Sequence, residues 1–210
     1  MTGFSVLLLG IGLGLRHATD ADHVVVVSTL VQREPGTWRA ARIAALWSAG
    51  HTLSFLTLGL LIVLAGVKIP ESFEQITELV VATMLIGLGV WHLARSSGDR
   101  DRGTTTSATA MAARPLAIGL VHGMAGSAGI ALLAATTISS RPLAAGYLGL
   151  VALGTALGMV ALTVVMSRPI GWTMRRKGPW RRATSAFAAL LSVALGLGVL
   201  LQAVVAEGAV

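Results

Sequence analysis

Residues 4–31 read FSVLLLGIGLGLRHATDADHVVVVSTLV, an apolar segment interrupted near its middle by charged and titratable side chains. A bilayer with a hydrocarbon core of about 30 Å is crossed by roughly 20 apolar helical residues, so this segment is long enough to span it. Ionisable groups inside a membrane are costly, and they persist mainly where they pair with one another or line a polar cavity. The segment therefore indicates a membrane helix that carries a functional site.

The composition extends this interpretation to the whole chain. Of 210 residues, 54% are hydrophobic and 12% are charged, whereas soluble domains carry about 25% charged residues. The chain has no cysteine, which excludes disulfides, thiolate metal sites and a cysteine nucleophile. We expect an all-α integral membrane protein with six transmembrane helices, at about 4–31, 43–66, 74–94, 115–138, 143–166 and 184–206.

The basic residues predict the orientation of these helices. The connections after the first, third and fifth spans hold thirteen Lys and Arg residues, while the opposite side holds only Lys68 and Arg141. Because positive charge is enriched in cytoplasmic loops, both termini are expected outside. The net charge of +7 is thus explained by topology, and no nucleic-acid partner is expected. The apolar surface of the protein is expected to contact the lipid bilayer. The sequence is compatible with a monomer and with a homo-oligomer.

The two halves of the chain resemble each other. The matched segments are 14–18 with 119–123, 50–53 with 154–157, and 85–90 with 194–199, at offsets of 105, 104 and 109. Units with an odd number of spans insert in opposite directions, so the pattern predicts a 3+3 inverted repeat, a common transporter architecture. The alternative is the compositional similarity of membrane helices rich in Gly, Ala and Leu.

This repeat divides the chain into three parts. Residues 1–95 form the first three-helix unit, and residues 114–210 form the second. The segment 96–113 between them is rich in Ser, Gly, Thr and mixed charge, which is typical of a cytoplasmic linker loop.

The interruption in the first span has the composition of a metal site. On an ideal helix His17, Asp20 and His23 share one face, while Asp22 lies about 100° from His23. Asp22 can therefore join the other three only if the helix unwinds locally; otherwise it pairs with Arg16. Imidazole favours borderline transition metals, and two carboxylates offset the charge of a divalent ion.

Further histidines are predicted at the same depth. His51 in the second span and His122 in the fourth lie in the same slab of the membrane as the first motif. The alternative roles are an interhelical hydrogen bond for His51 and a bond to a carbonyl for His122. Small residues after His122 indicate either close packing or a broken helix. His92 is expected near the cytoplasmic interface. The predicted metal ligands are His17, Asp20, Asp22, His23, His51 and His122.

The motif 17–23, a His followed after four residues by Asp-His, resembles the signature of the nickel/cobalt transporter (NiCoT) family. Gly50-His51-Thr52 resembles the Gly-His-Ser/Thr motif of the next helix in that family. The stretch 122–127 and the short chain are similar to the compact six-helix branch of urease-accessory-type nickel permeases. The resemblance implies metal recognition by the first motif and localisation in the bacterial cytoplasmic membrane.

We therefore expect a secondary transporter that takes up Ni²⁺ or Co²⁺ for metalloenzyme maturation by alternating access. The ion is the transported substrate, and no prosthetic group is expected. The chain lacks a Walker A sequence, and it lacks His-Glu-x-x-His, so neither an ATPase nor a metalloprotease is expected. The alternatives are a divalent metal exporter and a proton-coupled carrier of a small anion that uses Arg16 and the histidines.

Overall fold

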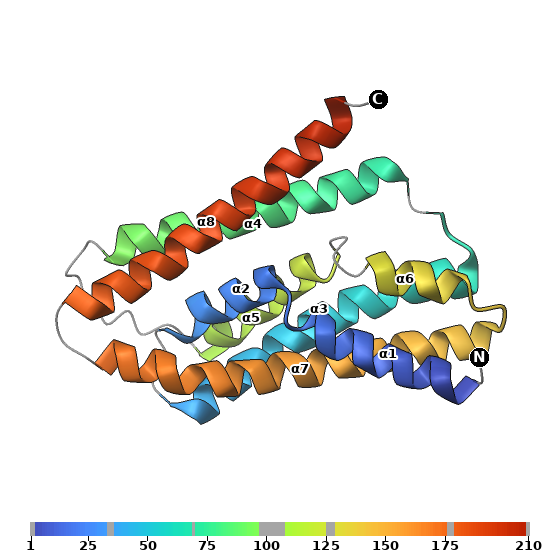
Figure 1. The fold of residues 1–210 in the computed structure, drawn as a ribbon, viewed down its shortest axis with the longest axis horizontal. Coiled ribbons are helices and arrows are strands. Elements are labelled where there is room, and N and C mark those ends of the chain that lie inside the picture. The colour runs from blue at the N-terminus through green and yellow to red at the C-terminus, as the bar shows by residue number, and fades with distance from the viewer. Residues whose placement is uncertain are drawn as a thin grey trace.

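The fold was analysed in a computed structural model, which describes residues 3–32, 36–68, 70–96, 108–124, 129–175 and 179–208. These residues form helices joined by short connections, with no strand among them (Figure 1). The helices are α1 (Gly3–His17), α2 (Ala21–Val31), α3 (Thr37–Ala65), α4 (Glu71–Ser96), α5 (Ala108–His122), α6 (Gly129–Thr136), α7 (Arg141–Arg175) and α8 (Pro179–Gly208).

The apolar segments of the sequence correspond to these helices in two ways. The segments at 43–66, 74–94, 143–166 and 184–206 each fall within one long helix, and α3, α4, α7 and α8 are each long and apolar enough to cross a membrane. The segment 4–31 is instead divided into the shorter apolar helices α1 and α2. The segment 115–138 is likewise divided, into α5 and α6. The protein is thus an all-helical membrane protein with two interrupted helices.

The helix boundaries correct the expected linker. Residues 97–107 of the predicted 96–113 loop lie outside the described residues, but α5 already begins at Ala108. Pro115, expected in a first helical turn, consequently lies inside α5. The extension follows from the sequence ATAMAA at 108–113, in which alanine and methionine favour a helix despite the neighbouring polar segment.

The helices pack in pairs that cross the two halves of the chain. The most extensive contacts join α4 to α8, α1 to α7, α3 to α7 and α3 to α5. In Figure 1 α4 and α8 lie side by side along one edge, while α3 and α7 run together along the other. The interrupted helices lie between these pairs, with α1 against α7 and α5 against α3.

Glycines permit two of these crossings. A Cβ atom on Gly14 of α1 would overlap the backbone of α7 at Val151 and Thr155. A Cβ atom on Gly119 of α5 would overlap the backbone of α3 at Trp47 and His51. Small residues that let backbones approach are the usual device of membrane helix packing. The two crossings are therefore built alike.

The third crossing, between α4 and α8, also depends on glycines. A Cβ on Gly89 would lie 2.6 Å from the carbonyl oxygen of Ala189, and one on Gly196 would lie 2.8 Å from that of Ala82. Gly89 and Gly196 are 107 positions apart, which is close to the repeat offsets of 105 and 104 found for the segments that contain Gly14 and Gly50. The repeat offset of 109 would instead match Gly87 to Gly196 and Gly89 to Gly198. A Cβ atom on Gly87 or on Gly198 would meet nothing within 4 Å among the described residues.

Many large hydrophobic side chains are exposed on the outer surface, as expected for a chain in lipid. Large hydrophobic side chains such as Leu133 and Val165 are about two-thirds exposed. Trp38, Trp172 and Trp180 are exposed as well, at the start of α3, near the end of α7 and at the start of α8. These three helix ends lie at the same end of the long axis in Figure 1.

Candidate metal centre

The candidate site begins where the first interrupted helix breaks. α1 ends at His17, and the amide N–H groups of Thr19 and Asp20 donate to the carbonyls of Arg16 and His17 in a tight turn. Asp20 is extended, with φ −60° and ψ 149°, and α2 starts at the next residue. The break changes the direction of the chain within the motif, so the side chains on its two sides can face a common centre.

Two carboxylates are paired with the two imidazoles of this motif. Asp20 Oδ2 lies 2.9 Å from His17 Nδ1, and Asp22 Oδ1 lies 3.0 Å from His23 Nδ1. An aspartate at a helix N-cap usually accepts a backbone N–H, but Asp20 makes no such bond because its carboxylate faces His17. A carboxylate on one ring nitrogen fixes the tautomer and leaves the other nitrogen for a metal ion.

The remaining imidazoles come from α3 and α5. His122 is the last residue of α5, and its Nε2 lies 3.1 Å from Asp22 Oδ2. A Cβ on Gly123 would overlap His51 O and the Ser54 hydroxyl, so the absence of a side chain there lets the end of α5 approach α3. Residues 125–128, where the sequence suggested a broken helix, lie outside the described residues, and α6 begins at Gly129.

The four imidazoles form one buried cluster. The ring centroids of His17 and His23 are 4.7 Å apart, those of His23 and His122 also 4.7 Å, and those of His23 and His51 5.2 Å. His23, His51 and His122 are at most 2% exposed, and His17 is 9% exposed. The structure therefore brings together all four histidines that the sequence assigned to the site, although they come from three separate segments.

Several nitrogens of this cluster lack hydrogen-bond partners. His17 Nε2, His23 Nε2 and His51 Nδ1 are buried, with no hydrogen-bond partner among the described residues. Buried polar atoms are nearly always satisfied, so three unpartnered nitrogens in one cluster of imidazoles call for a ligand. Two sets of side chains bring their ligand atoms within 4.8 Å of one another: His17, His23 and His51, and Asp22, His23 and His122.

The aspartates are arranged differently from the helical-face prediction. That prediction grouped Asp20 with the two motif histidines and left Asp22 apart, but the break brings Asp22 into contact with His23 and His122. The side chain of Asp20 is 40% exposed, and it is absent from both ligand sets. Arg16 is exposed and does not serve as the partner of Asp22, which contacts imidazoles instead.

Sequence reasoning missed Trp47. Trp47 is fully buried, its ring lies 5.4 Å from that of His23, and its Nε1 has no partner among the described residues. Its position four residues before His51, on the same helical face, was the available signal.

His92 lies outside the cluster. It is 2% exposed, and its Nε2 lies 2.7 Å from Gln32 Oε1 and 2.8 Å from the Ser185 hydroxyl.

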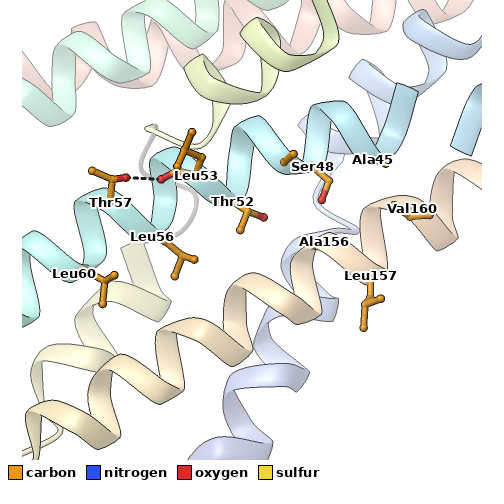
Figure 2. A pocket seen from close by; sticks show the side chains of 11 residues that line it. Ala45, Ser48, Thr52, Leu53, Leu56, Thr57, Leu60, Ala156, Leu157 and Val160 are labelled. Carbon is orange, nitrogen blue, oxygen red and sulfur yellow. Dashed lines mark hydrogen bonds between the residues drawn. The ribbon is translucent and has the colours of Figure 1, made fainter. Parts of the chain in front are cut away.

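A groove of about 720 Å³ runs between α3 and α7, and its lining is apolar apart from three hydroxyl groups (Figure 2). Thr57 donates its hydroxyl to the Leu53 carbonyl at 2.7 Å, which leaves little polarity on that wall. None of the lining residues is titratable, so the groove is a poor site for a cation. The lining residues are Ala45, Ser48, Ala49, Thr52, Leu53, Leu56, Thr57, Leu60, Ala156, Leu157 and Val160.

Two proteins of known name are similar to this chain. It is 32% identical over 140 residues to the urease accessory protein UreH of Bacillus sp. (strain TB-90), which covers 61% of each chain. It is 31% identical over 90 residues to the high-affinity nickel transport protein of Cupriavidus necator, which covers 41% of this chain and 26% of the relative. The chain thus matches less than two thirds of the length of either relative. No family model matches it, and neither does any solved structure.

These similarities confirm the resemblance to the nickel/cobalt transporter family that the motifs indicated. Neither relative is named as a catalyst, which agrees with the absence of hydrolase motifs in the sequence.

Proposed function

We propose that this chain takes up Ni²⁺, or Co²⁺, across a bacterial cytoplasmic membrane and supplies it for the maturation of a metalloenzyme. The observation that carries the proposal is the convergence of four buried imidazoles and the Asp22 carboxylate at the breaks of two helices. A urease accessory protein and a nickel transport protein among the relatives support nickel as the substrate.

The chemistry of the cluster suits a borderline divalent cation. Imidazole nitrogen is a preferred ligand of nickel, cobalt, zinc and copper, whereas Mg²⁺ and Ca²⁺ prefer all-oxygen sites. Imidazoles alone would leave the full charge of the ion in a low-dielectric surrounding. Asp22 lowers that charge, because its carboxylate contacts both His23 and His122. His17, Asp20, Asp22, His23, His51 and His122 are the residues we assign to the ion, with Asp20 acting through His17.

We propose six membrane crossings in two inverted units, with both termini outside. The corresponding glycines Gly14 and Gly119 support this arrangement, since each meets the backbone of a helix from the other half. Interrupted helices at the midplane, in matching positions of two inverted units, are typical of secondary transporters. The rocking of one unit against the other would then expose the cluster to each side of the membrane in turn.

Isotopic nickel uptake tests the proposal directly. Cells that express the chain are expected to accumulate more ⁶³Ni²⁺ than cells without it, and His23→Ala is expected to reduce the excess by more than about 100-fold, because even second-shell losses cost 10–100-fold. Arg16→Gln is the matched control, since Arg16 is charged, lies beside the motif and is exposed. Uptake by His23→Ala at the wild-type rate would refute the proposal.

The same experiment separates the alternatives. An exporter would lower the accumulated nickel below that of cells without the gene. A small-anion carrier would depend on Arg16 and would bind no metal when purified, so that Arg16→Gln would lose transport. Competition by Co²⁺ in the uptake medium ranks the two metals.

A further inference from the structure

The possible ligand atoms of the cluster separate into two sets that share one residue. His17, His23 and His51 form one set, which we call the imidazole set, and Asp22, His23 and His122 form the other, the carboxylate set. Within each set the ligand atoms lie within 4.8 Å of one another. His23 is the common member.

The ligand atoms do not all gather in one set. His51 and His122 do not belong to the same set among the described residues, and their ring centroids are 6.0 Å apart. His122 is instead joined to Asp22 at 3.1 Å.

The two sets also differ in origin and in charge. The imidazole set contains no carboxylate and comes entirely from α1, α2 and α3, which precede the linker. The carboxylate set contains an anionic side chain, and His122 comes from the end of α5, in the other half of the chain. A displacement of the α5 end therefore alters the carboxylate set and leaves the imidazole set intact.

We propose that these sets are two alternative positions for one Ni²⁺ ion, filled one at a time and exchanged through His23; this rests on the proposed function. A neutral imidazole has one lone pair, so His23 ligates one ion only, and its ring proton stays on the nitrogen that faces away from the ion. The ion moves from the imidazole set to the carboxylate set by exchanging His17 and His51 for Asp22 and His122.

The test uses the purified full-length protein, titrated with Ni²⁺ by calorimetry and with Co²⁺ by visible absorption. Wild type is expected to bind one ion. His51→Gln disrupts only the imidazole set, and His122→Gln disrupts only the carboxylate set, so each variant is expected to retain one ion. The variant that loses the weaker position should stay within about threefold of the wild-type Kd, because the stronger position dominates the affinity. His23→Gln disrupts both sets and is expected to weaken binding at least about 100-fold.

The spectra and the uptake rates supply independent readouts. The two single variants are expected to give different Co²⁺ spectra, one from a carboxylate-containing site and one from an all-imidazole site. Both should also lose more than about tenfold in ⁶³Ni²⁺ uptake while still binding metal, since a one-position carrier cannot pass the ion on. Size-exclusion profiles of the variants in detergent check that each is folded.

Several results would overturn the inference. Two ions bound per wild-type chain would exclude alternation. Loss of binding in His51→Gln and His122→Gln as complete as in His23→Gln would indicate one composite site, and so would identical Co²⁺ spectra. Nickel uptake by His122→Gln at the wild-type rate would show that the ion does not pass through the carboxylate set during transport. If wild type neither bound nor transported nickel, the proposed function itself would fail, whereas the preceding results leave it standing.

Discussion

The two interrupted helices of this protein have a similar shape and unlike chemistry. In the first, α1 and α2 are separated by three residues, and the break is surrounded by His17, Asp20, Asp22 and His23. In the second, α5 ends on His122, and α6 starts at Gly129 without an acidic residue nearby in the sequence. Each leading helix has 15 residues and crosses a partner helix at a glycine.

The difference shows that one helix architecture can serve two roles. The first break supplies all of the carboxylates and half of the imidazoles of the cluster, so we propose that it contributes most to binding the ion. The second contributes one imidazole at the end of a helix that is held close by Gly119 and Gly123. Backbone approach is therefore the main contribution of the second half, and charge is the contribution of the first.

The largest effects are expected from filling the two glycine crossings. Gly14→Ala and Gly119→Ala each place a Cβ against backbone atoms, which cannot move as a side-chain end does. Each should lower the free energy of unfolding by about 1–3 kcal/mol or more, the usual cost of overpacking. Thermal unfolding in detergent measures it, with Gly12→Ala as the control because a Cβ there meets nothing within 4 Å. Equal stability of Gly119→Ala and Gly12→Ala would contradict the comparison.

The next effect concerns the carboxylate that joins the two breaks. Asp22→Asn keeps the shape of the side chain but removes its charge beside His23 and His122. Nickel affinity, measured by calorimetry, is expected to fall by about 10–100-fold, as it does when a carboxylate behind a metal-bound histidine is removed. An unchanged affinity would mean that the ion does not use this part of the cluster.

A smaller loss is expected at the other carboxylate. Asp20 contacts only His17, and its side chain is 40% exposed, so solvent screens it. Asp20→Asn should weaken nickel binding by less than about tenfold, at the low end of such effects. A loss larger than that of Asp22→Asn would reverse our ranking and would favour Asp20 as a direct ligand.

The smallest effect concerns α2 and α6, the second helices of the two interrupted segments. α2 contacts α4 and α8, and Gln32 just after it pairs with the buried His92 at 2.7 Å. Gln32→Ala should cost about 0.5–1.5 kcal/mol of stability, because one buried hydrogen bond is lost while His92 Nε2 keeps the Ser185 hydroxyl. The Thr136 hydroxyl at the end of α6 donates to the Leu133 carbonyl and is exposed, so Thr136→Ala should change the unfolding free energy by less than about 0.5 kcal/mol. An equal loss of unfolding free energy in the two variants would mean that packing and hydrogen bonds stabilise α2 and α6 to the same extent.

Much of the site could be predicted from the sequence, because charges in an apolar segment have few explanations. The motif was found by its charges in an apolar segment, and His51 and His122 by their expected depth. Of the two alternatives for Asp22, local unwinding or a pair with Arg16, the structure shows the first. What could not be predicted is which aspartate faces the cluster, since a break between His17 and Ala21 changes the direction of every later side chain. The approach of Trp47 depends on the α3–α5 crossing, which spacing does not encode.

The fold was predictable to a similar degree. Apolar length indicated the long helices, but the start of α5 at Ala108 was missed because polar composition was taken as loop. The third repeat match differs from the packing: the sequence aligned 85–90 with 194–199 at an offset of 109, whereas the glycines at the crossing of α4 and α8, Gly89 and Gly196, are 107 positions apart. Packing selects the glycine at the point of closest approach, and repeated Gly-Leu pairs leave that choice open.

The length of α7 has a mechanical consequence. Its 35 residues form a rod of about 52 Å, and even at a steep tilt of about 40° it extends beyond a 30 Å hydrocarbon slab by about 10 Å. Arg168 and Trp172 on its last turns are exposed, and indole rings favour the headgroup layer. We therefore expect this end of α7 to lie at the headgroup layer, together with the exposed tryptophans near the starts of α3 and α8. Three long helices would then be held at one membrane surface, so we expect movement during transport to centre on the break between α1 and α2.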